Sequence, residues 1–409
     1  MEYEIDEYGH CIIPEGIKVI EGMAFSGCRN LKSVKIPDSV TSIGNSAFEG
    51  CSSLESIEIP DSVTSIGSSV FSGCTGLRTI KVAEDNEHYM SVDNCLLTKD
   101  GTRIIAGCSS SGSIKIPYGV TSIGDWAFSG CSGLKSIEIP NSVTSIGCGA
   151  FFGCSSLGSI EIPDSVTSIG GGAFCGCSSL ESVEIPSSVT SIGDCVFSRC
   201  TGLRTIKVAE ENEHYMMSVD NCLLTKDGTR IIAGCSSLDS IKIPDSVTSI
   251  GDGAFSGSSS LRSVEIPDSV TSIGDEAFSG CSSLESIEIP DSVTSIGEGA
   301  FSGCSSLKSV EIPSSVTSID DLSFFGCSGL EFVDIPNSVT SIRHWAFDGC
   351  INLKSVTIHE KKPEKAFELI RNALYNISNI TLNVPIGTGY AYRHHPYFAQ
   401  FKEIVAKVR

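Results

Sequence analysis

Apolar and polar residues follow each other in a pattern that returns every 23 residues along most of the chain, marked by an Ile-Pro dipeptide. Within one repeat, Leu54, Ile57 and Ile59 are spaced so that their side chains point to the same side. Glu58 lies between the two isoleucines and points to the opposite side. The stretch therefore predicts a short strand with one buried face. Pro60 has no N–H to donate to a sheet, so it ends the strand at a corner.

A second short extended segment follows the corner. Val63 and Ile66 give it two inward-facing side chains, and Gly67 is expected to allow the next bend. The repeat then closes with a short helical turn that carries a phenylalanine. A single unit of this kind cannot bury its apolar side alone, so neighbouring units must stack. The predicted fold is a repeat solenoid, a β-rich array of 23-residue coils, with one continuous aromatic spine. The spine positions are Phe25, Phe48, Phe71, Phe128, Phe151, Phe174, Phe197, Phe255, Phe278, Phe301, Phe324 and Phe347.

The period is interrupted twice, at about 81–115 and at about 207–242. The two inserts are almost identical in sequence. Each contains an Asp-Gly pair between two apolar runs, as at Asp100-Gly101, and this arrangement is a strong hairpin signal. Each insert is therefore predicted to be an enlarged coil that carries a β-hairpin.

The repeat motif reads Leu-x-x-Ile-x-Ile-Pro, then Val-x-x-Ile-Gly, then Ala-Phe-x-x-Cys. This motif resembles the BspA-type leucine-rich repeats of bacterial and protist surface proteins, and the resemblance covers nearly the whole chain. It implies a leucine-rich repeat array used for adhesion or protein binding, located at the cell surface or secreted. The motif is specific for the fold and much less specific for function.

The repeat pattern fades near residue 356, which predicts a solenoid over 1–356 and a capping segment over 357–409. Pro363 suits the first turn of a helix, and apolar residues recur at helical spacing after it. A strand is expected at 380–384. Solenoids need an atypical terminal unit to cover the apolar face of the last coil. The segment is therefore predicted to be a small α+β cap, and its Val-Pro-x-Gly motif resembles the closing segment of BspA-type arrays.

Acidic residues dominate the charge of the 409-residue chain. Its 28 Lys and Arg and 49 Asp and Glu give a net charge of −21. This sign argues against nucleic acid binding, which needs a basic surface, and against docking on anionic lipid. No apolar run approaches the roughly 18 residues that span a bilayer, so no membrane insertion is expected. The acidic start has no apolar signal region, so a cytoplasmic location stays open beside the surface location that the resemblance implies.

Nineteen cysteines are present, and thirteen of them share one slot of the repeat. Ser258 stands in this slot in one coil, which indicates that the slot requires a small residue. We therefore expect buried free thiols rather than disulfides, and the spacing is not a metal-binding pattern. His88 and His214 follow acidic stretches, where a solvated loop is favoured over a metal or ligand site. No cofactor is expected. The slot holds Cys28, Cys51, Cys74, Cys108, Cys131, Cys154, Cys177, Cys200, Cys235, Cys281, Cys304, Cys327 and Cys350.

No residue stands apart from the repeat as a catalytic nucleophile would, because each candidate serine or glutamate recurs in many coils. The chain also lacks a phosphate-binding loop and a dinucleotide fingerprint. We therefore predict a non-enzymatic, adhesin-like scaffold for a protein partner, or alternatively an intracellular interaction scaffold. A carbohydrate-binding module is disfavoured, because Phe332 is the only aromatic residue in the outward strand columns.

The outward positions between the two inward strand residues are the candidate binding sites. Like charges stacked on neighbouring strands repel each other, yet two runs of coils carry only acids at this position. A basic partner surface or a cation would explain the runs; the other interpretation is a solvated face with screened charges. The predicted binding residues are Glu138, Glu161, Glu184, Glu265, Glu288, Glu311 and Asp334.

Overall fold

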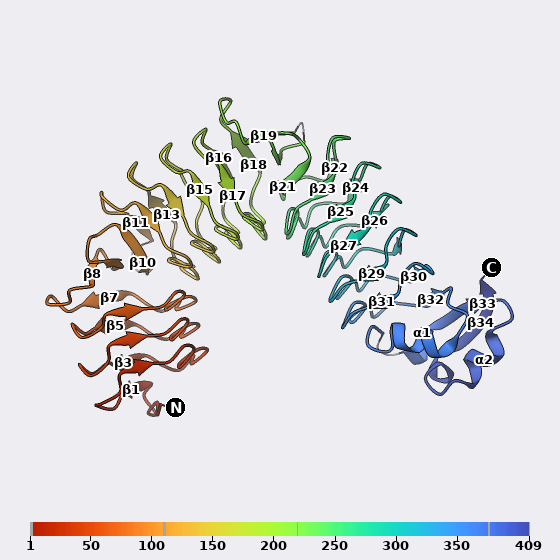
Figure 1. Cartoon of the computed structure of the whole chain (residues 1–409), viewed down its shortest axis with the longest axis horizontal. Helices are drawn as coiled ribbons and strands as arrows, with labels where there is room; N and C mark the ends of the chain where they lie inside the picture. The colour runs from red at the N-terminus through yellow and green to blue at the C-terminus, as the bar shows by residue number, and fades with distance from the viewer. Residues whose placement is uncertain (1–2, 109–111, 219, 375–376, 409) are drawn as a thin grey trace. The chain divides into compact units, whose positions relative to one another are not determined.

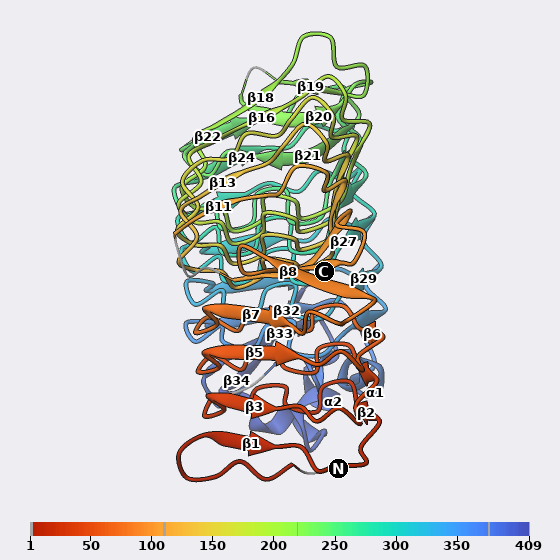
Figure 2. The same cartoon turned by 90° about the vertical axis from the view of Figure 1, so that its left-hand side faces the viewer.

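The computed structural model describes residues 3–108, 112–218, 220–374 and 377–408. The chain forms two compact units, Met1–Tyr215 and Met216–Arg409. Each unit is a stack of coils, and the strands of successive coils lie side by side within it (Figures 1 and 2). Two columns of short parallel strands therefore run through each unit.

The first column has the alternation that the sequence predicts. In β5 (Ser56–Ile59), Ile57 and Ile59 are buried and Glu58 is exposed. Glu58 pairs in register with Lys81, so equivalent residues of successive coils are neighbours. The other strands of this column in the first unit are β1 (His10–Ile12), β3 (Ser33–Lys35), β7 (Thr79–Val82), β11 (Ser113–Lys115), β13 (Ser136–Glu138), β16 (Ser182–Ile185) and β18 (Thr205–Val208). In the second unit they are β22 (Ser240–Lys242), β24 (Ser263–Glu265), β26 (Ser286–Ile287), β28 (Ser309–Glu311), β30 (Phe332–Ile335) and β32 (Ser355–Ile358).

A second, shorter strand follows each proline corner. The Thr64 N–H donates to the carbonyl of Thr41 in the preceding coil at 2.9 Å, and the Thr64 hydroxyl reaches the same oxygen at 3.2 Å. This double contact recurs from coil to coil and ties the stack together. The strands of this column in the first unit are β2 (Val19–Ile20), β4 (Ser42–Ile43), β6 (Ser65–Ile66), β12 (Ser122–Ile123), β14 (Ser145–Ile146), β15 (Ser168–Ile169) and β17 (Ser191–Ile192). In the second unit they are β23 (Ser249–Ile250), β25 (Ser272–Ile273), β27 (Ser295–Ile296), β29 (Ser318–Ile319) and β31 (Ser341–Ile342).

The glycine after the second strand is required by crowding between coils. A Cβ atom on Gly67 would lie 2.5 Å from the backbone nitrogen of Asn45 in the preceding coil. Such a contact is far inside van der Waals distance, so only glycine lets the two coils approach this closely. The sequence correctly singles out this position but assigns it a bend rather than a close approach.

Hydrogen-bonded turns carry the phenylalanines. The Cys51 N–H donates to the Phe48 carbonyl at 3.1 Å, and the turn begins at Ser46, whose φ is 55°. The rings of Phe25 and Phe48 are stacked with centroids 5.1 Å apart and an angle of 8° between their planes. Stacking of this kind joins Phe25 to Phe71, Phe128 to Phe197, and Phe255 to Phe347 through the intervening rings.

The prediction of one continuous aromatic spine is wrong, because the first insert interrupts the column. The Gly107 N–H donates to Ala127 at 2.7 Å, just as the Phe25 N–H donates to Ala47 at 2.8 Å, so Gly107 occupies a phenylalanine position. A Cβ atom on Gly107 would lie 2.1 Å from the ring of Phe128. The backbone of the insert thus packs against a ring where the regular coils place another ring.

Each insert forms antiparallel strands. In the first, β8 (Tyr89–Val92), β9 (Cys95–Thr98) and β10 (Arg103–Gly107) form a meander, and β10 then pairs in parallel with β12. The predicted hairpin at Asp100-Gly101 joins β9 to β10. A further hairpin at Asp93-Asn94 joins β8 to β9, and both of its residues have positive φ, as a type I′ turn requires. The strands of the second insert are β19 (Tyr215–Met217), β20 (Cys222–Thr225) and β21 (Arg230–Gly234).

The predicted capping segment extends the first column of the second unit. The helix α1 (Pro363–Ile370) begins at the predicted proline, and Ala366 and Ile370 join the buried cluster of the last coils. The predicted boundary at residue 357 falls inside β32, which ends at Ile358, and the division between array and cap stays a prediction. In the described ranges, no helix combines the length and apolar character needed to cross a membrane. The remaining elements are η1 (Ile377–Asn379), β33 (Thr381–Pro385), α2 (Gly389–His394), η2 (Phe398–Gln400) and β34 (Glu403–Val408).

Candidate interaction surface

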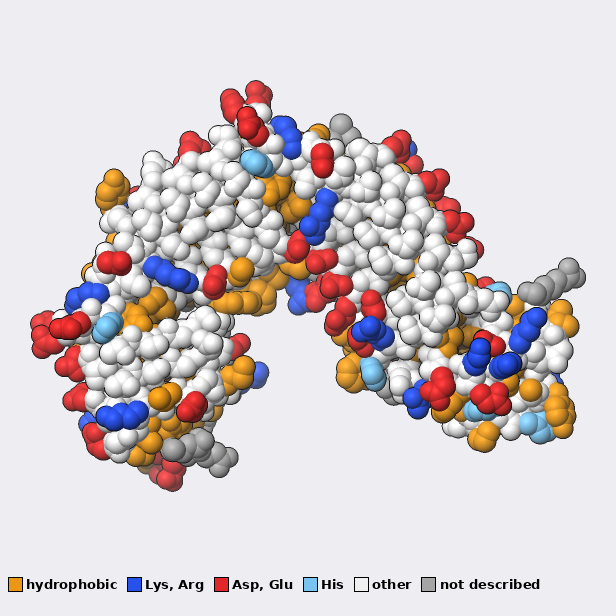
Figure 3. Space-filling view, in the orientation of Figure 1, with side chains coloured by type: hydrophobic (Ala, Val, Ile, Leu, Met, Phe, Trp, Pro, Cys, Tyr) orange, Lys and Arg blue, Asp and Glu red, His pale blue; other side chains and the backbone are white. Residues whose placement is uncertain are grey.

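All seven predicted acidic residues lie on the exposed side of the first column. Glu311 of β28 pairs in register with Asp334 of β30, so two carboxylates are direct neighbours on adjacent strands. Figure 3 shows acidic side chains (red) recurring along the coils of the second unit. The exposure of these residues follows from the alternation in the sequence, while their role in binding stays a prediction.

Basic residues stand at both ends of the acidic run in the first unit. Lys115 Nζ lies 2.7 Å from Glu138 Oε1. At the other end, Lys207 pairs in register with Glu184. Glu161 lies between these ends. The two terminal carboxylates of the run therefore have cationic neighbours, which reduce the net negative charge at its ends.

The second unit repeats this arrangement. Lys242 Nζ lies 2.7 Å from Glu265 Oε1, and His359 Nε2 lies 2.7 Å from Asp334 Oδ1. The interior carboxylates differ from these ends, since no side-chain cation of the described residues lies within ion-pair distance of them. These interior residues are Glu161 in the first unit and Glu288 and Glu311 in the second.

A neighbouring outward column of the second unit behaves differently. It lies three residues before the acidic column, and its charges alternate in sign from each coil to the next. Arg262 approaches Glu285 at 3.8 Å, and Lys354 approaches Glu331 at 2.6 Å. Such surface pairs contribute at most about 1 kcal/mol each, but alternation removes repulsion between coils. The alternating column is Asp239, Arg262, Glu285, Lys308, Glu331 and Lys354.

Grooves lie over the first column in the first unit. One groove of about 800 Å³ is lined by Lys35, Glu58 and Lys81, where the charges alternate. Another, of about 430 Å³, has Glu161 and Glu184 in its lining. These hollows place charged side chains over apolar strand residues, an arrangement that suits an extended segment of a protein partner.

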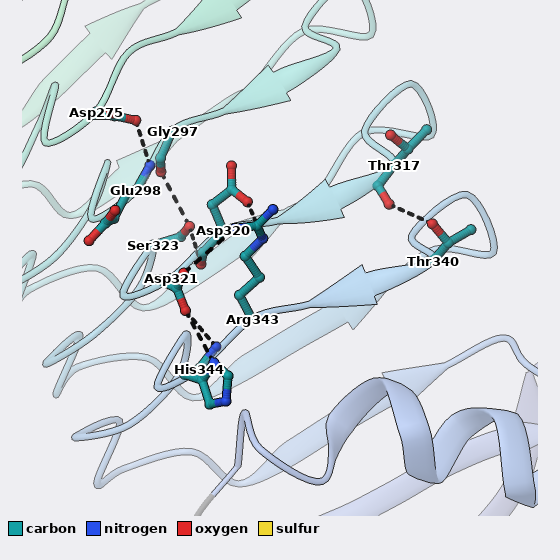
Figure 4. A network of polar contacts seen from close by, with 10 residues as sticks. All are labelled: Asp275, Gly297, Glu298, Thr317, Asp320, Asp321, Ser323, Thr340, Arg343 and His344. Atoms are coloured by element: carbon teal, nitrogen blue, oxygen red, sulfur yellow. Dashed lines mark hydrogen bonds and ion pairs between the residues drawn. The ribbon is translucent and has the colours of Figure 1, made fainter.

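A polar network lies in the two coils that lack the glycine found after the second strand in earlier coils (Figure 4). Asp320 and Arg343 stand where earlier coils have glycine, and Arg343 Nε lies 3.0 Å from Asp320 Oδ1. The His344 N–H donates to Asp321 Oδ1 at 2.8 Å. The buried Ser323 hydroxyl donates to the Asp320 carbonyl at 2.8 Å, so no base holds it as a nucleophile. The network ties coils together and shows no catalytic arrangement.

The cysteine ladder is a structural device. Cys177 Sγ donates to the Phe151 carbonyl in the preceding coil at 3.2 Å, and the same contact recurs along the stack. None of the nineteen cysteines forms a disulfide, and Cys148 is the one that is exposed. Burial raises the pKa of Cys177 to about 12. A thiol with so high a pKa is protonated near neutral pH and is therefore a poor nucleophile.

Two cysteines that the sequence assigned to the ladder lie outside it. Cys108 follows Gly107 directly, whereas Cys51 follows Phe48 by three positions. The Cys108 Sγ donates to the Asn94 carbonyl in its own insert at 3.5 Å. The Cys131 Sγ donates to the Gly107 carbonyl at 3.6 Å. Cys235 stands in the same way after Gly234. The inserts end in Gly-Cys like the regular coils, but here the glycine and not a phenylalanine three residues before the cysteine takes the spine position, so the shared dipeptide does not mark the same slot.

The acidic stretch before His88 is an exposed loop that leads into β8, as predicted, but it contains one buried polar residue that the sequence did not reveal. Asn86 is fully buried, and its Nδ2 donates to the carbonyls of Pro60 at 2.7 Å and Val63 at 3.1 Å. Its Oδ1 accepts the N–H groups of His88 and Tyr89, each at 2.8 Å. The Asn86 side chain therefore supplies hydrogen bonds to the Pro60 and Val63 carbonyls at a place where the stack has no further regular coil.

The same replacement occurs in the second insert. Asn212 Nδ2 donates to Pro186 at 2.7 Å and to Val189 at 3.2 Å, and the Ile192 N–H donates to the Tyr215 hydroxyl at 2.7 Å. The 23-residue period does not indicate these residues, because each occurs only once per insert. Among the described residues, no group of three or more His, Cys, Asp or Glu side chains is placed to hold a metal ion.

Comparison with known proteins follows the repeat. A model described as the BspA type leucine-rich repeat region (6 copies) matches residues 3–99, 101–222, 228–354 and 305–387. This chain belongs to the BspA-type leucine-rich repeat family. The resemblance in the sequence motif is thereby confirmed, as is the solenoid fold. Membership also supports a repeat scaffold for protein interaction, in a family that is typically non-enzymatic.

Solved structures with the same fold extend the comparison. A leucine-rich cell surface protein from Faecalibacterium prausnitzii A2-165 is 30% identical, with a TM-score of 0.54 over 87% of this BspA-type chain and 92% of its own. A leucine-rich repeat protein from Eubacterium ventriosum is 22% identical, with a TM-score of 0.50 over 87% and 86% of the two chains, and it shows the fold alone. No curated protein gives a significant match.

Proposed function

We propose that this protein is a non-enzymatic, adhesin-like scaffold, displayed at the cell surface or secreted, which binds a protein partner through the acidic column. The partner presents a basic surface to the interior carboxylates, of which Glu288 and Glu311 are central. The family and the cell-surface neighbour from F. prausnitzii support the scaffold role and the location. The net charge of −21 suits a cationic protein.

The observation that carries this proposal is the contrast between two outward columns of the same coils. In the alternating column, Glu285 has Arg262 as a neighbour in the preceding coil. Three residues further along each coil, Glu288 and Glu311 succeed each other with the same sign. Two like charges about 5 Å apart repel by about 1 kcal/mol or less in water. The fold can relieve this repulsion, as the alternating column demonstrates, so its retention supports a cationic partner.

Association kinetics with the native partner test the proposal. The double variant Glu288→Lys/Glu311→Lys is compared with Glu285→Lys/Glu331→Lys, and each changes the net charge from −21 to −17. We expect the first variant to slow association about tenfold at low salt, with a weaker salt dependence, and the second to stay close to wild type. Equal rates for the two variants would show that net charge, and not this column, governs binding.

A second candidate is an intracellular interaction scaffold. The nineteen unbridged thiols favour it, because reducing compartments keep cysteines in this form. Protease shaving of intact cells separates the two locations. A surface scaffold is cleaved while cells stay intact, whereas an intracellular one is protected until the cells are lysed.

A further inference from the structure

The column of second strands ends wherever the next coil supplies no equivalent strand. Among the described residues, this happens after β6 and β17 in the first unit and after β31 in the second. Each end leaves main-chain groups directed at an empty strand position, and buried groups of this kind need partners.

Two of these ends are closed by side chains from the inserts. After β6, Asn86 takes the carbonyls of Pro60 and Val63, and the Ile66 N–H donates to the Tyr89 hydroxyl at 2.9 Å. After β17, Asn212 and Tyr215 make the equivalent contacts. The chain thus closes such an end with one asparagine and one tyrosine.

The end after β31 has no such closure. The groups equivalent to those of the first insert are the carbonyls of Pro336 and Val339 and the N–H of Ile342. Within its own turn the Val339 N–H donates to the Pro336 carbonyl at 3.1 Å, as the Val63 N–H does to Pro60 at 3.3 Å. Unlike at β6, no side chain of the described residues donates to the Pro336 or Val339 carbonyl or accepts the Ile342 N–H. The carbonyls of Thr340 and Ile342 also receive no hydrogen bond from the described residues, so this edge is open to a ligand.

A groove runs between this edge and α1. Its volume is about 570 Å³, and its apolar floor includes Val339, Ile342 and Ile358. The helix contributes Glu364 and Glu368 to the lining. Glu360 and Lys365 also line the groove, so its rim carries more negative than positive charge. The groove therefore favours an occupant with a basic side chain.

We propose that an extended peptide from a partner protein adds to β31 as a parallel strand in this groove. Within the stack, the Thr64 N–H donates to the Thr41 carbonyl at 2.9 Å and the Gly67 N–H to the Ile43 carbonyl at 2.8 Å. The peptide repeats this pattern on Thr340 and Ile342. An apolar side chain covers the floor, and a lysine or arginine faces the glutamates of α1.

This site differs in kind from the acidic column, because main-chain hydrogen bonds and an apolar floor supply most of the binding. Its occupancy therefore depends weakly on salt, whereas binding at the acidic column depends on it strongly. The proposal can fail or succeed without changing the assignment of the column.

The test uses the full chain and a displayed library of random twelve-residue peptides. Peptides selected on the wild-type chain are synthesised and offered to chains in which Thr340 or Thr64 is replaced by the photo-crosslinker p-benzoylphenylalanine. Thr64 is the matched control, because Tyr89 and Asn86 close its edge. We expect crosslinking at position 340 to exceed that at position 64 at least tenfold. Equal labelling, or a selection that returns no binder at 340, overturns the proposal.

A methylation scan then tests the strand geometry. N-methylation of the peptide amide that donates to Thr340 removes one main-chain hydrogen bond and adds a clash, so affinity should fall at least about tenfold. N-methylation of the adjacent amide, which points away from β31, should change affinity less than about threefold. Equal losses at both amides contradict strand addition. Sedimentation of the chain alone completes the test, since a second copy seated on β31 would appear as self-association and would also overturn the proposal.

Discussion

Replacement of Asn86 by alanine is expected to destabilise the first unit severely. The fully buried side chain makes four hydrogen bonds, two as a donor to Pro60 and Val63 and two as an acceptor from His88 and Tyr89. Alanine leaves the Pro60 and Val63 carbonyls and the Tyr89 N–H buried without this side chain, and the part-buried His88 N–H loses the same partner. At about 1 kcal/mol for each bond, the expected loss in the free energy of unfolding is about 4 kcal/mol.

Urea unfolding followed by circular dichroism measures this loss. Asn212→Ala provides an independent copy of the experiment, because Asn212 makes the same contacts at 2.7 to 3.2 Å in the second insert. Asn141→Ala is the matched control. Asn141 is exposed and follows a repeat proline, so its loss should change stability by less than about 0.5 kcal/mol.

Amide exchange locates the effect. In Asn86→Ala, protection should fall first at Ile66, whose N–H donates to the Tyr89 hydroxyl that Asn86 positions. If both asparagine variants lost less than about 1 kcal/mol, or if exchange at Ile66 were unchanged, the insert would not be closing the edge of β6.

Three further predictions concern packing, pH and the end of the stack. Gly107→Ala should destabilise the protein by about 1 to 3 kcal/mol, because the new methyl group meets the Phe128 ring. Gly158→Ala is the control and should be neutral, since the space around its Cβ position is open. Similar urea midpoints for the two variants would contradict the packing. Burial raises the pKa of Cys281 and Cys350 to about 12, above the roughly 8.5 of an unfolded thiol. The free energy of unfolding should therefore be highest below about pH 8.5 and fall as the pH rises toward 12. A urea midpoint that is constant from pH 8 to 10.5 would refute this. Deletion of 357–409 should expose the apolar end of the last coil and cause self-association in sedimentation velocity, and a monomeric truncated chain of equal stability would show that the segment is a separate module.

The features that repeat could be predicted from the sequence, because a 23-residue period fixes which side chains share a column. Ile57 and Ile59 are buried and Glu58 is exposed for this reason. The sign alternation around Glu285 was equally open to such a reading, since it needs only the period.

The features that occur once or twice could not be predicted in this way. Asn86 stands among acidic neighbours and looks like part of a solvated loop, but the end of a strand column demands a polar partner there. Gly107 takes a phenylalanine position only because β10 enters the stack with a shifted register. The open edge of β31 is visible only when the three ends of the column are compared in space.

Mapping of zero-length crosslinks tests the proposed binding column most directly. A carbodiimide joins a carboxylate to a partner lysine with which it is in contact, and mass spectrometry then identifies the carboxylate. In the complex with the native partner, crosslinks are predicted at Glu288 and Glu311 and not at Glu285 or Glu331, although all four belong to the same coils. Crosslinks confined to Glu285 and Glu331, or spread evenly over both columns, would contradict the assignment of the binding surface.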